Sequence, residues 1–164
     1  MRGLVILLAL AIPSLVACGS GYVEGGPLAV DTDYGVETHA DAAGVVSWGV
    51  VLPAIESSEP AVIESVEPQG VSGLTVLAVL ASDPDGMSIG TARGWPSPSS
   101  AFSDAVGQTV PSDGPSGRLQ IVLVVRLDSA EGHIAGVRLR YRQGTVRYET
   151  AYPWWLTVRP LPAR

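Results

Sequence analysis

An all-β sandwich, immunoglobulin-like in general shape and built from about six to eight strands, is the fold that this sequence predicts. Three observations lead to it. Short segments alternate apolar with polar residues and are rich in β-branched and aromatic side chains. Glycine- and proline-rich turns separate these segments, and no amphipathic helix longer than a few turns is visible.

The chain starts with an apolar stretch of the kind that directs export. Met1-Arg2 supplies a positive charge, and residues 4–16 are almost wholly apolar. As a helix, this stretch would reach roughly 20 Å, which is short of a hydrocarbon core of about 30 Å. We therefore expect a cleaved signal peptide over residues 1–17 and no permanent membrane span.

Leu15-Val16-Ala17-Cys18 ends this stretch and resembles the lipobox of bacterial lipoproteins. The resemblance implies cleavage before Cys18, a diacylglyceryl group on its thiol, and anchorage on the extracytoplasmic side of the cell membrane. Two acyl chains meet the requirement for stable attachment. The alternative is an ordinary secretory signal with an incidental cysteine. Because Cys18 is the only cysteine, internal disulfides and cysteine zinc sites are excluded.

Residues 18–43 have few large apolar side chains and many Gly, Asp, Glu, Ala and Thr residues. Such a segment buries too little apolar surface to offset the entropy of ordering. We expect the lipidated cysteine and a flexible tether up to residue 43, with a reach of roughly 25 to 30 Å. The β-sandwich domain would then cover residues 44–164.

The first predicted strand covers residues 45–52, in which the alternating apolar positions are Val46, Trp48, Val50 and Leu52. We expect Trp48 in the core, as on an early strand of many β-sandwiches, with a ligand role as the weaker alternative. Residues 61–67 form a second, less regular strand between two prolines. Residues 74–81 are continuously apolar, which suits a buried strand but also a short helix.

Residues 82–117 have the composition of a long loop, with clusters of proline, glycine, serine and aspartate. A structureless loop of this length is implausible inside a compact domain. We expect one or two short edge strands in it, among which we place residues 106–110.

The C-terminal third gives the clearest strand pattern. Residues 119–127 place five apolar side chains on one face: Leu119, Ile121, Leu123, Val125 and Leu127. Residues 133–142 and 145–152 are predicted to form a hairpin closed by Gln143-Gly144, where Gly144 can adopt a positive φ. The last strand covers residues 154–158.

The predicted hairpin gathers arginines on one face. Its turn would pair residue 140 with 147 and residue 138 with 149, and would place Val137, Leu139, Tyr141, Val146 and Tyr148 on the core face. If Trp154 points inward on the last strand, Trp155 and Arg159 point outward. The candidate interaction face therefore consists of Arg138, Arg140, Arg142, Arg147, Trp155 and Arg159. The alternative is a solvated sheet face, with Trp155 lying over arginine stems.

The charge distribution leaves two interpretations of these arginines open. Residues 18–117 hold thirteen acidic residues and one arginine, whereas residues 118–164 hold eight arginines and three acidic residues. The two regions either neutralise each other within one fold or leave the arginines facing an anionic surface. The negative net charge argues against nucleic acid as a partner.

Two segments, residues 45–52 and 140–148, resemble short exported actinobacterial proteins of unknown function, a resemblance that implies no activity. No nucleophile elbow, P-loop or dinucleotide-binding motif occurs. We expect neither cofactor nor metal, since Asp83 and Asp85 lack the other residues of a calcium loop and the two histidines lack partners. The prediction is a non-catalytic, lipid-anchored β-sandwich that contacts a protein or the cell envelope. The alternative is a lipoprotein that binds a small molecule or glycan through the Arg/Trp155 face or the 82–117 loop.

Overall fold

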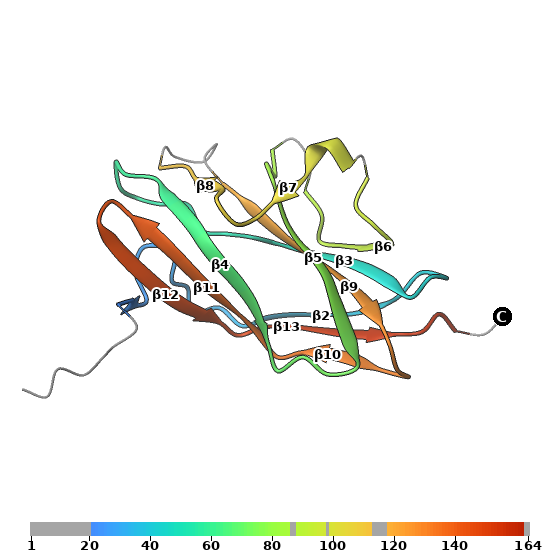
Figure 1. Ribbon diagram of the computed structural model, residues 1–164. Helices are drawn as coiled ribbons and strands as arrows, with labels where there is room; N and C mark the ends of the chain where they lie inside the picture. The colour runs from blue at the N-terminus through green and yellow to red at the C-terminus, as the bar shows by residue number, and fades with distance from the viewer. Residues whose placement is uncertain (1–20, 86–87, 98, 113–117, 163–164) are drawn as a thin grey trace, which may run out of the picture.

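The computed structural model describes residues 21–85, 88–97, 99–112 and 118–162, and it confirms an all-β sandwich (Figure 1). Apart from one 3₁₀ turn, Ser99–Ala101, the regular elements in these ranges are strands arranged in three sheets. None of the described segments forms a helix that is long and apolar enough to cross a membrane. Cys18 and the predicted signal peptide lie outside the described residues.

Sheet A contains five strands, which in spatial order are β1 (Val23–Glu24), β12 (Val146–Tyr152), β11 (Gly136–Gln143), β4 (Ala61–Gln69) and β8 (Thr109–Val110). Sheet B contains three: β10 (Gly132–Ile134), β13 (Trp154–Arg159) and β2 (Tyr34–His39). Sheet C contains β6 (Thr91–Arg93), β3 (Val45–Val51), β9 (Gln120–Leu127), β5 (Leu74–Ser82) and β7 (Ser103–Asp104).

Sheets A and B form one layer of the sandwich, and sheet C forms the other. Strand β10 continues into β11 after Ala135, and β12 continues into β13 after Pro153, so that one long hairpin runs through both sheets (Figure 1). Side chains of this hairpin alternate between the core and the outside. Trp154, Leu156 and Val158 are buried while Arg159 is exposed, which confirms the predicted orientation of the last strand.

The core lies between the two layers. Its fully buried members include Trp48 and Leu123 from sheet C and Leu139, Tyr141 and Leu156 from the opposite layer. Trp48 is therefore a core residue, as predicted. A second, smaller cluster lies on the other face of sheet C, where Val122 and Val124 are covered in part by Phe102.

The longer strands agree well with the sequence pattern. Among the described residues, eight strands have six or more residues, and five have two or three. The run at 74–81 is a strand and not a helix, and β4 extends past Pro68 to Gln69. The 82–117 region contributes three short strands, β6, β7 and β8, which lie at sheet edges as expected but number one more than predicted, and only residues 109–110 of the predicted segment 106–110 form a strand.

The prediction of a flexible tether is wrong for the described part of residues 18–43. Strand β1 pairs with β12, and β2 pairs with β13 in parallel over its whole length. Between them, Leu28 is fully buried. Composition missed this because backbone hydrogen bonds to strands more than a hundred residues away hold the segment in place, with only a few apolar anchors.

The predicted hairpin register is also wrong, by two residues. Gln143 pairs with Val146, so the turn is Gly144-Thr145, and Arg140 faces Glu149 and not Arg147. Gly144 does have a positive φ of 56°, but it is the first central residue, which is the pattern of a type II′ turn. A shift of two residues preserves the faces, so the arginines still share one side of sheet A.

Candidate functional site

The outer face of sheet A carries the arginines that the sequence singles out, but it also carries glutamates. A β-bulge lies where β4 pairs with β11: Arg140 is opposite Ser65, and Tyr141 is opposite Ile63. The extra residue, Glu64, shifts the alternation of β4, so that Glu64 and Glu67 both contact arginines on the outer face. Three residues apart in an unbroken strand, they would point to opposite faces.

Arg140 is the centre of this network. Its Nε lies 2.6 Å from Glu149 Oε2, and its Nη1 lies 2.9 Å from Glu67 Oε1. Arg138 lies close to the same two glutamates: its Nη1 is 3.9 Å from Glu67 Oε2, and its Nε is 3.8 Å from Glu149 Oε1. The hydrogen bond to Glu149 raises the pKa of the Arg140 guanidinium. These ion pairs leave little free charge for an external ligand.

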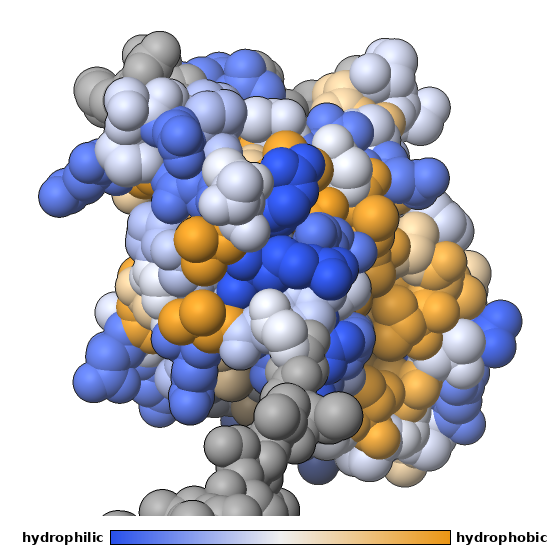
Figure 2. All heavy atoms as spheres, turned by 60° about the vertical axis from the view of Figure 1, so that its left-hand side comes forward, coloured by the Kyte–Doolittle hydropathy of each residue, from blue (hydrophilic) through white to orange (hydrophobic). Residues whose placement is uncertain are grey.

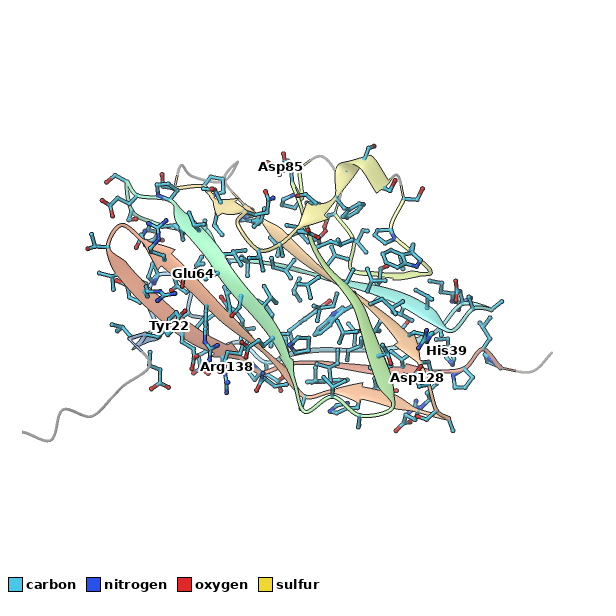
Figure 3. All side chains as sticks on the ribbon, in the orientation of Figure 1. Tyr22, His39, Glu64, Asp85, Asp128 and Arg138 are labelled. Atoms are coloured by element: carbon cyan, nitrogen blue, oxygen red, sulfur yellow. The ribbon has the colours of Figure 1, made fainter. Side chains whose placement is uncertain are left out.

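Tyr22 covers the remaining part of the network. Its hydroxyl donates to Glu64 Oε2 at 3.0 Å, and the same carboxylate lies 2.9 Å from Arg147 Nε. The guanidinium carbons of Arg140 and Arg147 lie 5.3 and 4.7 Å from the centre of the Tyr22 ring, within cation–π range. Figure 3 shows Tyr22, Glu64 and Arg138 close together on this side of the molecule.

The other predicted face residues do not join this network. Arg142 donates to the carbonyl of Gly144 and has no carboxylate partner among the described residues. Arg159 lies in sheet B, where it pairs with Glu37 at 2.9 Å and Glu131 at 2.7 Å. Trp155 is half-buried over Gly35, where a Cβ would come within 1.7 Å of the indole. The structure thus splits the candidate face into separate parts.

These contacts decide between the two interpretations of the charge distribution. Arginines from the last third of the chain pair with glutamates from the first half, as in Arg147–Glu64 and Arg140–Glu67. The two regions of opposite charge therefore neutralise each other within the fold. The sequence gives no clear signal for the bulge that brings Glu64 and Glu67 to this face, and Tyr22 lies in the segment predicted to be a flexible tether.

A pocket of about 460 Å³ lies on a different side of the sandwich, between the end of β3 and the segment that leads into β2. Its walls are mostly apolar, with two aromatic rings and a few polar groups: Val30, Thr32, Tyr34, Gly49, Val50, Val51, Pro53, Ser88, Ile89, Gly90, Gln120 and Trp154. This size and composition are typical of small-molecule sites.

A buried glutamine fixes one wall of the pocket. Gln120 is 1% exposed, and its side-chain amide makes two hydrogen bonds to the backbone of Ile89, accepting at 2.9 Å and donating at 2.7 Å. The next residue, Gly90, accepts a backbone hydrogen bond from Gly49 at 2.9 Å. A Cβ at Gly49 would come within 2.0 Å of the Ile89 carbonyl oxygen, so only glycine permits this approach.

Two buried tyrosines fix the opposite wall. The Tyr141 hydroxyl donates to the carbonyl of Gly25 and accepts from the backbone N–H of Leu28, and the Tyr152 hydroxyl donates to the carbonyl of Leu28. Burial raises the pKa of Tyr141 to about 12 and also raises that of Tyr152. These bonds hold the segment that carries Val30, Thr32 and Tyr34 to the pocket. The tether prediction had placed these residues outside the domain.

The described residues contain no arrangement typical of hydrolytic or metal chemistry. His133 Nδ1 lies 3.2 Å from Thr157 Oγ1, and no hydrogen bond or ion pair there joins either histidine to a carboxylate. No group of three or more metal-ligating side chains occurs in the same ranges. Asp83 accepts a hydrogen bond from the backbone N–H of Asp85, which is a plain turn.

Comparison with known proteins gives no family. No family model and no curated protein matches the chain. Among solved structures, the chain is similar to the Vibrio cholerae VesB protease with a TM-score of 0.35 and 9% identity, over 77% of this chain and 30% of that chain. So low a similarity carries no argument about activity.

Proposed function

We propose that this chain is a lipid-anchored, extracytoplasmic and non-catalytic β-sandwich that binds a small, largely apolar ligand in the pocket between β2 and β3. The observation that carries the proposal is the pocket itself: about 460 Å³, with apolar walls, the aromatic rings of Tyr34 and Trp154, and few polar groups. Gln120 and the buried tyrosines hold both walls in place, so a ligand would find the site largely pre-formed.

The expected affinity is moderate. A ligand of about 20 non-hydrogen atoms that gains about 0.3 kcal/mol per atom binds with about 6 kcal/mol, which corresponds to a Kd of tens of micromolar. Its polar groups would be few, because the lining has few polar side chains: Thr32, Tyr34, Ser88 and Gln120. An amphipathic or aromatic metabolite fits this chemistry better than a highly charged one.

Anchorage is supported by Leu15-Val16-Ala17-Cys18, which resembles a lipobox. The proposal places the domain outside the cytoplasm, with Cys18 acylated. In cells, Cys18→Ala is expected to move the protein from the membrane fraction to the soluble fraction. An unchanged membrane fraction would defeat the anchor without affecting the pocket.

Binding itself is tested with the fluorescent probe 1-anilinonaphthalene-8-sulfonate. Val51→Trp is expected to fill the pocket and weaken probe binding at least ten-fold. Val71→Trp is the matched control, since Val71 is 39% exposed against 36% for Val51 but does not line the pocket. Equal binding by both variants and the native protein would contradict the proposal.

Contact with a partner through the arginine face, the outer face of sheet A that carries Arg138, Arg140, Arg142 and Arg147, stays a prediction. Because Arg138, Arg140 and Arg147 are already paired with glutamates, this face offers less to a charged partner than its arginines suggest. We therefore propose ligand binding in the pocket, and not contact through the arginine face, as the main function.

A further inference from the structure

The first described residues are fixed firmly to one end of sheet A. Tyr22 is held by Glu64 and lies over two guanidinium groups. The backbone of β1 pairs with Tyr148 and Glu149 of β12, and the N–H of Gly25 donates to the carbonyl of Glu149 at 2.8 Å. The chain therefore enters the domain at a defined place, on the left of Figure 1.

This place is very close in sequence to the proposed anchor. Cys18 precedes Tyr22 by four residues, which span at most about 14 Å even when fully extended. The long tether expected from the composition is therefore replaced by a short connection. A lipidated Cys18 would hold this end of sheet A within about 14 Å of its own position at the bilayer surface.

The surface at this end has the composition of a membrane-contacting site. Val23 is 54% exposed and Val146 is 39% exposed, and Val146 lies two residues before Tyr148, the register partner of Val23. Arg142 and Arg147 are exposed on the adjoining hairpin. Figure 2, which turns this side forward, shows a cluster of hydrophilic residues with small apolar spots on its left and a broader apolar area on its right. Arg142, which has no carboxylate partner among the described residues, is the guanidinium group that can bind a lipid phosphate, and the exposed valines at the same end of the sheet can contact the headgroup layer.

We propose that this end of sheet A, formed by Tyr22, Val23, Arg142, Val146 and Arg147, lies against the phospholipid headgroups of the membrane that carries Cys18. The inference rests on the proposed lipidation. Glu24, Glu59 and Glu64 belong to the same region, so its net charge is small and anionic lipid is not required. The far end of the hairpin, near Val158, lies up to about 40 Å away along the strands.

The test measures which end of the domain approaches the lipid. The full-length, lipidated protein is reconstituted in phosphatidylcholine vesicles that contain a headgroup spin-labelled phosphatidylcholine. A fluorescent label is attached at Val146→Cys or, as control, at Ala130→Cys, which is exposed in the turn before β10. Quenching at position 146 is expected to be several-fold stronger than at position 130. Equal quenching, or stronger quenching at position 130, overturns the inference.

A second variant tests the role of the short connection. Insertion of about 20 glycine and serine residues after Ser20 lengthens the reach to roughly 25 Å, so quenching at position 146 should fall towards that at position 130. Quenching at position 146 that stays unchanged contradicts the role of the short connection and shows that the surface itself holds the domain against the headgroups. The mass of the purified protein reports separately whether Cys18 is acylated. A missing acyl group defeats the proposed anchor, whereas acylation with equal quenching defeats only the orientation.

Discussion

The arginine face and the pocket both satisfy their polar groups within the protein, but they leave different surfaces to the solvent. On the arginine face, Arg138, Arg140 and Arg147 meet glutamates from other strands, and these contacts satisfy the charges within the protein. At the pocket, the polar groups of Gln120 and Tyr152 are used to fix the walls, and the apolar surface between them stays open. The first region stabilises the fold, while the second leaves a surface that a ligand can cover.

The largest effect is expected where the wall that carries Tyr34 is attached. Gly26 has a φ of 90°, and a Cβ there would lie 2.5 Å from the Tyr141 hydroxyl and from the Tyr148 ring. Gly26→Ala should lower the free energy of unfolding by about 2 to 4 kcal/mol, from overpacking and backbone strain together. Chemical denaturation measures this loss. Gly21→Ala is the control, because Gly21 also has a positive φ but a Cβ there meets nothing within 4 Å.

A substitution in the wall that Gln120 holds is expected to lower the free energy of unfolding somewhat less. Gln120→Leu replaces the polar amide with an apolar side chain of similar size, and it leaves the partly buried N–H and carbonyl of Ile89 without these partners. The expected loss is about 1 to 3 kcal/mol in the free energy of unfolding, together with weaker probe binding. Denaturation and a binding titration measure the two effects. Unchanged values of both would show that the glutamine does not hold the wall.

Alkaline pH should release the same segment that Gly26→Ala disturbs. Because burial raises the pKa of Tyr141 to about 12, folded protein keeps this tyrosine neutral, whereas unfolded protein ionises it near pH 10. The stability that depends on a neutral Tyr141 is therefore complete below pH 10 and falls as the pH rises towards 12, by about 1 kcal/mol at pH 11. Absorbance at 295 nm and unfolding at each pH measure this effect. Tyr141→Phe should weaken the pH dependence.

The smallest effect is expected on the arginine face. Arg147 and Glu64 are 49% and 22% exposed, so a double-mutant cycle with Arg147→Gln and Glu64→Gln should give a coupling of about 0.2 to 1 kcal/mol. Salt should reduce it further. A coupling well above this range would show that the network contributes more to the fold than an exposed ion pair usually does.

The sequence predicted the long strands well and their partners poorly. Alternation placed Trp48 and Leu123 in the core, and it placed the arginines on one outer face, because these properties depend on local periodicity. The hairpin register, the bulge at Glu64 and the parallel pairing of β2 with β13 depend on contacts distant in the chain. The alternation of Tyr34, Val36 and Thr38 was the one local signal for β2.

For the candidate site too, local patterns were predictable from the sequence and distant contacts were not. Arginine is conspicuous at alternating positions, whereas the pocket combines ordinary apolar residues from four separate segments. Val30, Val51, Ile89 and Trp154 meet only in the folded chain. No spacing in the sequence could have brought them together. A pattern of charged residues can therefore be recognised before the fold is known. Whether residues of opposite charge pair with them can be seen only in the folded structure.

Hydrogen exchange with and without saturating 1-anilinonaphthalene-8-sulfonate tests most directly whether the pocket is the binding site. The account predicts slower exchange at residues 49–51 and 88–90, which line the pocket, and no change across residues 138–149 of the arginine hairpin. Protection confined to residues 138–149 would contradict the account and would make the arginine face the preferred candidate for the binding site.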